Sequence, residues 1–264
     1  MIRPAFAALL LVAPICGPAW AETAEEKGLR IATEADAADT GFGDSETVMT
    51  MTLRNRHGDE SVRHFRSRTL EVHDDGDKSV SVFDRPRDVK GTAVLTFSHA
   101  AEPDDQWLYL PALKRVKRIS STNVSGSFVG SEFAFEDLGS QELAEYTYRW
   151  LADEPCPGAG ELSCHMLERF PVDEHSGYTR QVAWLDEAEY RAFKIDYYDR
   201  KNAPLKTLTL DDHRQYLGRY WRAHRLEMVN LQTGKSTALE VADYQFQVGL
   251  TDRDFDQKAL KRVR

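Results

Sequence analysis

The amino-acid sequence predicts a mainly β protein, because stretches with the texture of strands occupy most of the chain after residue 43. Roughly a dozen such stretches follow one another, and short turns rich in glycine separate them. In several of them large apolar side chains alternate with charged ones, as Phe193 and Ile195 do with Lys194 and Asp196. An antiparallel meander, a barrel and a strongly curled sheet all fit this pattern.

The first elements of the mature chain are one helix and six strands. Residues 22–38 are rich in Ala and Glu and predict an amphipathic helix that ends near Gly41. In the first strand Met49, Met51 and Leu53 lie on one side and threonines on the other, and Gly58 marks the turn that follows. The six expected strands share alternation or apolar runs and cover 48–54, 61–73, 78–84, 92–98, 106–110 and 115–120.

Residues 121–144 break this rhythm with three glycines, two phenylalanine-rich steps and a short helical piece at 141–144. Strands then resume, and Gly177, Gly218 and Thr233-Gly234 mark turns between them. These later strands are expected at 145–152, 163–170, 178–186, 191–198, 205–216, 220–231 and 236–248, before a closing helix at 252–260. No linker or repeat divides the chain, so 22–264 are predicted to form one domain.

Residues 1–21 predict a secretory signal that is removed on export. Arg3 supplies the positive start, Ala5–Ile15 is an apolar run, and Ala19-Trp20-Ala21 has the small residues of a cleavage site. The run is too short for a membrane anchor. A lipid-modified Cys16 is the other alternative, and the bulky residue before it disfavours this. We therefore expect a mature protein in the bacterial periplasm.

The composition excludes several classes of protein. Hydrophobic residues are 41% of the 264, which is typical of a globular protein and not of a disordered or multi-span membrane chain. The 43 acidic and 34 basic residues leave a net charge of −9, which argues against a nucleic-acid-binding surface. We expect no nucleic acid partner and a monomer.

Two cysteines remain after the predicted cleavage. Cys156 and Cys164 flank the turn-rich sequence Pro-Gly-Ala-Gly, and cysteines of exported proteins usually pair. We predict a structural disulfide. A redox pair is the alternative, but the Cys-x-x-Cys spacing is missing.

Local motifs for catalysis, metals and cofactors are weak. The eight histidines show neither His-x-x-x-His nor His-Glu-x-x-His spacing, so no metal site is predicted. The segment from Gly234 to Thr237 lacks the first glycine of a phosphate loop, and the segment from Gly126 to Gly130 places its serine wrongly for a nucleophile elbow. We expect no cofactor and no enzyme activity, with a hydrolase of scattered active site as an alternative.

The stretch from 105 to 138 is the most informative. Four cations, Lys114, Arg115, Lys117 and Arg118, lie within five residues of an acidic protein. They fit an anionic head group or the acidic patch of a partner, and a solvated strand face is the ordinary alternative. The phenylalanines of the following insert are expected to cover the mouth of a hollow in the sheet.

The run WLYLPALKRVKRISS, followed by GSFVGSEFAFEDL, resembles the outer membrane lipoprotein-sorting protein family, which is similar in fold to the periplasmic carriers LolA and LolB. GDKSVSVFDRP, KGTAVLTFSH, GYTRQVAWLD and YWRAHRLEMVNLQTGKST extend the resemblance over the mature chain. The resemblance implies a single curled antiparallel sheet, an unclosed β-barrel, with a few helices as lid or plug. It also implies a hydrophobic cavity that takes up acyl chains, and a partner in an inner-membrane lipid exporter.

These inferences predict a periplasmic carrier of lipid or lipoprotein acyl chains, with an adaptor for an exporter as a second alternative. The residues expected to line the cavity are large and apolar, although ordinary core packing would explain each of them as well. They are Met49, Met51, Leu53, Trp107, Tyr109, Val116, Phe128, Phe133, Phe135, Trp184, Trp221, Leu226 and Met228.

Overall fold

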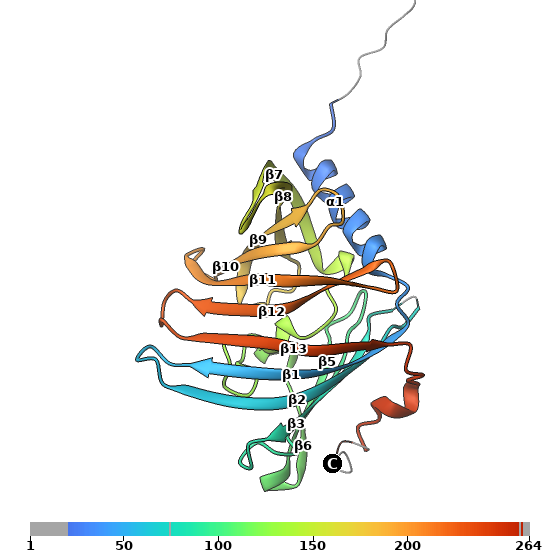
Figure 1. The fold of residues 1–264 in the computed structure, drawn as a ribbon, viewed down its shortest axis with the longest axis vertical. Helices are drawn as coiled ribbons and strands as arrows, with labels where there is room; N and C mark the ends of the chain where they lie inside the picture. The colour runs from blue at the N-terminus through green and yellow to red at the C-terminus, as the bar shows by residue number, and fades with distance from the viewer. Residues whose placement is uncertain (1–20, 74, 259, 261–264) are drawn as a thin grey trace, which may run out of the picture.

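The computed structural model describes residues 21–73, 75–258 and 260. Of the predicted signal sequence 1–21 only the last residue is described, so that prediction lies outside the described residues. A single antiparallel sheet of thirteen strands dominates the structure, curled but not closed into a barrel (Figure 1). The prediction of a mainly β fold with a curled sheet is confirmed. Among the described residues no helix is long and apolar enough to cross a membrane.

The strands follow one another as a meander with hairpin connections. Their bounds are β1 Asp44–Arg54, β2 Glu60–Leu70, β3 Lys78–Arg85, β4 Ala93–Phe97, β5 Asp105–Leu110, β6 Arg115–Arg118, β7 Tyr146–Cys156, β8 Ala159–Pro171, β9 Tyr178–Asp186, β10 Ala192–Asp199, β11 Pro204–Tyr216, β12 Tyr220–Asn230 and β13 Ser236–Phe246. The sheet order is β6-β5-β4-β3-β2-β1-β13-β12-β11-β10-β9-β8-β7, so the first and last strands pair in its middle.

The two edges of the sheet, β6 and β7, are consecutive in the chain. Residues 119–145 must therefore cross from one edge to the other. They fill part of the concave side as an insert with three 3-10 helices, η2 Ser121–Asn123, η3 Phe135–Asp137 and η4 Leu143–Glu145. The short helix expected at 141–144 is only the single turn of η4.

In the described part of the chain the remaining helices are one α-helix, α1 Ala24–Asp39, and two 3-10 turns, η1 Pro111–Leu113 and η5 Asp252–Phe255. The closing helix expected at 252–260 was therefore too long. The predicted N-terminal helix is confirmed as α1. It begins with a capping box, in which Thr23 accepts from the Glu26 backbone N–H at 3.1 Å and the Glu26 carboxylate accepts from that of Thr23 at 2.8 Å.

The main hydrophobic core joins the insert to the concave face of the sheet. Phe128 lies 5.6 Å from Phe83 and 6.5 Å from Phe65, measured between ring centroids. Met51 and Met228, from the central strands, are fully buried in the same cluster. The aromatic side chains of the insert are thus buried in the core as a plug, where a cover over the mouth of a hollow was expected.

Both faces of β3 and β4 are apolar, unlike the strands in which large apolar side chains alternate with charged ones. Phe83 points to the plug, whereas Val82 and Leu95 belong to a second cluster with Phe255 and Leu260 of the C-terminal tail. The tail is the reason, because it covers the convex face here.

A disulfide joins Cys156 to Cys164 with a sulfur–sulfur distance of 2.01 Å, so the predicted pairing is confirmed. It links the last residue of β7 to Cys164, which lies within β8 opposite Glu154, and Trp184 packs in the same cluster.

Candidate functional site

A cavity of about 1000 Å³ remains in the part of the sheet that the plug does not fill. Helix α1 lies on one side of it, the concave face of the sheet lies on the other, and residues 138–143 of the insert also line it. Figure 1 shows α1 beside the β7–β8 end of the sheet. A cavity of this volume is at the upper end of those that bind small molecules.

Small residues keep this part of the sheet hollow. Ser45 and Thr47 of β1 face Thr69 and Ser67 of β2, and all four line the cavity. Ser79 continues the row on β3 opposite Thr69. Further along the same strands the inward positions carry large side chains that belong to the plugged core, namely Met51, Phe65 and Phe83. The size of the inward residues therefore sets where the cavity ends.

The wall of the cavity carries aliphatic side chains, which we call the aliphatic strip, beside polar and charged groups. Leu185 links its two parts, since it packs against the main core and also against the cluster beneath α1. The aliphatic side chains of the strip are Ala32, Ala35, Ala38, Met49, Val72, Leu138, Leu143, Leu167, Leu185, Leu210 and Leu226. This surface suits hydrocarbon.

Charged groups lie at the margins of the cavity, and most have partners. Arg191 pairs with Asp186 at 2.8 Å, and Arg222 pairs with Asp39 of α1. Burial, reinforced by nearby carboxylates, raises the pKa of Asp77 to about 7, against a backbone hydrogen bond that lowers it. This shift makes the lining less acidic than its composition indicates.

Arg169 on β8 differs from these cations. Its side chain is 9% exposed, lines the cavity, and has no carboxylate within ion-pair distance among the described residues. Nε donates to the amide oxygen of Gln181 at 2.7 Å, Nη1 donates to that of Gln141, and Nη2 has no partner. The guanidinium also lies 5.0 Å from the ring centroid of Tyr146.

Several contacts hold α1 over the cavity. The Tyr190 hydroxyl donates to Glu34 at 2.6 Å, and Lys27 pairs with Asp153 at 3.0 Å. Gly28 lets the helix approach β7 closely, because a Cβ there would lie 2.8 Å from backbone atoms of Arg149 and Trp150. The side chain of Lys27 also lies over the ring of Trp150, 3.6 Å from its centroid.

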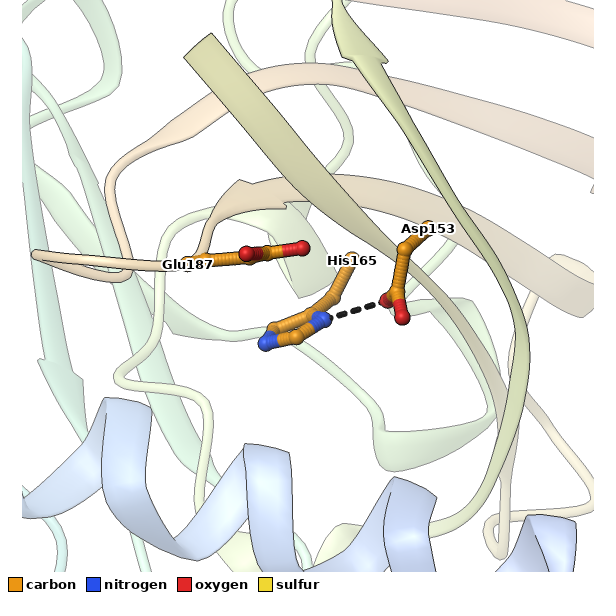
Figure 2. A group of neighbouring side chains, drawn as sticks. All are labelled: Asp153, His165 and Glu187. Atoms are coloured by element: carbon orange, nitrogen blue, oxygen red, sulfur yellow. Dashed lines mark hydrogen bonds and ion pairs between the residues drawn. The ribbon is translucent and has the colours of Figure 1, made fainter.

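Asp153, His165 and Glu187 form a group whose possible ligand atoms all lie within 4.8 Å of one another (Figure 2). The Asp153 carboxylate already accepts from His165 Nδ1 at 2.6 Å, from Trp150 Nε1 at 2.8 Å and from Lys27. Burial acts to raise its pKa, but these hydrogen bonds outweigh burial and lower it to about 2. The cation of Lys27 makes this group an anchor for α1.

One serine–carboxylate pair faces the cavity. Ser140 Oγ donates to Glu142 at 2.6 Å and accepts the backbone N–H of Asp77 at 3.1 Å. No histidine among the described residues is hydrogen-bonded to either side chain. These are the bonds of a local turn and not of a Ser–His catalytic pair.

The structure divides the thirteen residues predicted as lining among four places. Met49, Trp221 and Leu226 line the cavity. Met51, Leu53, Phe128, Phe133, Phe135 and Met228 belong to the plugged core or pack against it. Trp107, Tyr109 and Val116 lie in the cluster under the C-terminal tail, and Trp184 packs beside the disulfide.

The four predicted cations lie away from the cavity. Lys114, Arg115, Lys117 and Arg118 are exposed on the edge strand β6 and its turn, and none lines the cavity. Arg118 pairs with Asp105 of the neighbouring strand. Arg169 and the row of serines and threonines were missed by sequence reasoning. For the serines and threonines the only signal in the sequence was the spacing of two between small residues.

Solved structures share this fold. A LolA superfamily protein from Nitrosomonas europaea has this fold with a TM-score of 0.68, at 19% identity over 88% of this chain and 98% of that one. A family model described as an uncharacterized protein matches residues 75–262, and no curated protein matches the chain.

Two solved structures are more similar. A domain from Vibrio parahaemolyticus, named for outer membrane lipoprotein sorting, is 55% identical with a TM-score of 0.87, over 90% of this chain and all of that one. A DUF1329 family protein from Desulfovibrio piger is 30% identical with a TM-score of 0.84, over 90% and 99%. The chain therefore belongs to the outer membrane lipoprotein-sorting protein family. The comparisons indicate no catalytic family.

Proposed function

We propose that this protein is a periplasmic carrier, which shelters the acyl chains of a lipid or lipoprotein in the cavity under α1 and delivers them toward the outer membrane. The observation that carries the proposal is the cavity of about 1000 Å³ with its aliphatic strip, in a protein of this family. The disulfide fits an exported location, because disulfides persist in oxidising compartments.

The physical need for such a carrier follows from the hydrophobic effect. Each methylene that leaves water contributes about 0.8 kcal/mol, so a long chain does not cross an aqueous space unsheltered. A preformed hollow costs stability, because side chains along it lack packing partners. Here the small serines and threonines of β1 and β2 line the hollow, and the buried side chains of the plug form the hydrophobic core that stabilises the fold.

Met49, Trp221 and Leu226 are the proposed contacts among the residues expected from the sequence, joined by Leu185 and Leu210. The residues buried in the plug would meet cargo only if the plug moved. We propose Lys114, Arg115, Lys117 and Arg118 as the contact to a partner's acidic patch, because they lie outside the cavity. An inner-membrane lipid exporter is the proposed partner, and the carrier is proposed to act as a monomer.

The test of the carrier is to fill the cavity. Ala35→Trp places an indole into the hollow from α1, and we expect the affinity for a fluorescent fatty acid to fall at least tenfold. Ala37→Trp is the matched control, since Ala37 is an exposed residue of the same helix and does not line the cavity. Equal binding by both variants would contradict the proposal.

Charge reversal separates the partner contact from the cargo site. The double variant Arg115→Glu and Arg118→Glu should keep fatty-acid binding within about twofold, because exposed charges far from a site act weakly through water. It should lose binding to the exporter in a pull-down. If fatty-acid binding falls as well, the cations serve the cargo.

A further inference from the structure

The unpartnered guanidinium of Arg169 is the group in the cavity that the proposed function does not explain. A buried charge is costly unless a counter-charge and hydrogen bonds compensate it. Arg169 has two neutral amide oxygens as partners, and its Nη2 is a buried donor with none. Such a group in a cavity wall is a vacant place for an anion.

The surroundings hold the guanidinium in place and keep other anions from it. Gln181, 2% exposed, binds it from within the sheet at 2.7 Å, and the Tyr146 ring lies over it. The nearby Asp137 is already paired with Lys206 at 2.7 Å. Burial, reinforced by Asp104, raises the pKa of Glu145 to about 8 and disfavours a carboxylate there, while the charge of Arg169 lowers that pKa.

Gln141 is the exposed partner. It belongs to residues 138–143 of the insert, lines the cavity, and accepts from Nη1 of Arg169. An anion that displaces this amide would meet both Nη atoms in the planar fork that suits carboxylate and phosphate. The aliphatic strip, with Leu143 and Leu167, lies in the wall of the same cavity.

We infer that Arg169 binds the anionic oxygen group of an amphiphile, a carboxylate or a phosphate, whose hydrocarbon chain occupies the cavity. The inference rests on the proposed function, and adds that the cargo carries a negative group at its buried end. Gln141 fills the place of that group in the empty protein.

The test is a comparison of probes with one chain and different ends. A fluorescent fatty acid, its methyl ester and an alkyl phosphate of the same length are titrated into the whole mature protein. The wild type should bind at least one anionic probe about tenfold or more tightly than the ester, as expected for a charge-assisted hydrogen bond. The stronger anion identifies carboxylate or phosphate as the source.

Two variants test whether Arg169 causes the preference for anionic probes over the ester. Arg169→Gln should bring the anionic probes to within about twofold of the ester, and Arg169→Lys should keep part of the preference. Arg149→Gln removes an exposed cation that does not line the cavity, and this variant should keep the full preference for the anionic probes. If Arg169→Gln fails to fold, Gln141→Ala replaces it, and the fatty acid should then bind several-fold more tightly with the ester unchanged.

The outcomes are distinct. Equal affinity of the wild type for all three probes overturns the role of Arg169 but leaves the carrier standing. An anion preference that survives in Arg169→Gln also overturns the role of Arg169. Where Gln141→Ala is tested instead, an unchanged affinity for the fatty acid overturns it. If no probe binds the wild type, the proposed function itself fails.

Discussion

The two halves of the concave side differ although the same strands form them. At the plugged end, Met51, Phe65 and Phe83 pack against the phenylalanines of the insert in one buried cluster. At the open end, Ser45 and Thr69 face a cavity of about 1000 Å³. The difference teaches that one sheet can supply a solid core and a hollow at once, when the inward side chains change size along each strand.

A consequence of this division is that stability and binding should respond to different residues. Substitutions in the plugged half should change the free energy of unfolding, because the buried side chains there pack against one another. Substitutions in the open half should change uptake at small cost to folding. Each prediction below sharpens or breaks that separation.

Phe128→Ala should have the largest effect. Its side chain is 2% exposed between the rings of Phe65, Phe83 and Phe135, and a large-to-small change in such a core costs about 3–5 kcal/mol. Urea unfolding measures the loss, while fatty-acid affinity of the folded variant should stay within about twofold. Leu113→Ala, at an exposed residue, is the control. A variant of full stability that no longer binds would reverse the assignment of the two halves.

Gly28→Ala should act on the cover of the open half. The added Cβ would lie 2.8 Å from the backbone of β7, so α1 must shift outward. We expect a loss of about 1–3 kcal/mol from the strained contact, partly offset by the better helix propensity of alanine, and faster release of bound fatty acid in stopped-flow displacement. Ala37→Ser changes the exposed side of the same helix and should alter neither quantity. Unchanged release from Gly28→Ala would argue against α1 as the cover.

The pH dependence tests the boundary between the halves. Burial raises the pKa of Asp104 to about 6, of Asp77 to about 7 and of Glu145 to about 8. In these groups the folded state holds protons that the unfolded state has lost, so the free energy of unfolding falls as pH rises from about 4 to about 8, with a limiting slope near 1.4 kcal/mol per pH unit for each. Glu145→Gln should flatten this decline in urea titrations. An identical slope would place Glu145 in a solvated environment.

Ser67→Leu should have the smallest effect on stability. It extends the row of large inward residues by one layer from Phe65 into the hollow. New apolar burial favours folding, and loss of the 3.1 Å hydrogen bond to Ser81 opposes it, so we expect a net change within about 1 kcal/mol. Fatty-acid capacity, measured by equilibrium titration, should fall. Ser61→Leu lies at an exposed position of the same strand and should leave capacity intact.

The sequence predicted much of the fold because alternation and turn residues are local signals. The strands from β1 to β13 and α1 were found, with boundary errors at the β7–β8 hairpin, where the ladder continues to Cys156 and Ala159. The sequence predicted helices where the structure has 3-10 turns, because the same few helix-forming residues occur in both. The disulfide followed from the number of cysteines and the predicted export.

The sequence by itself determined which residues are apolar, which face of each strand they share, and to which family the chain belongs. Only the tertiary structure decided which apolar residues surround a hollow and which fill a core. Phe128 and Leu226 are both large apolar residues in the sequence. The path of residues 119–145 between the two sheet edges buries Phe128 in the core and leaves Leu226 in the wall of the cavity. The tertiary structure also decided that Nη2 of Arg169 is buried without a hydrogen-bond partner. Whether a donor finds a partner depends on long-range packing, which no local sequence pattern encodes.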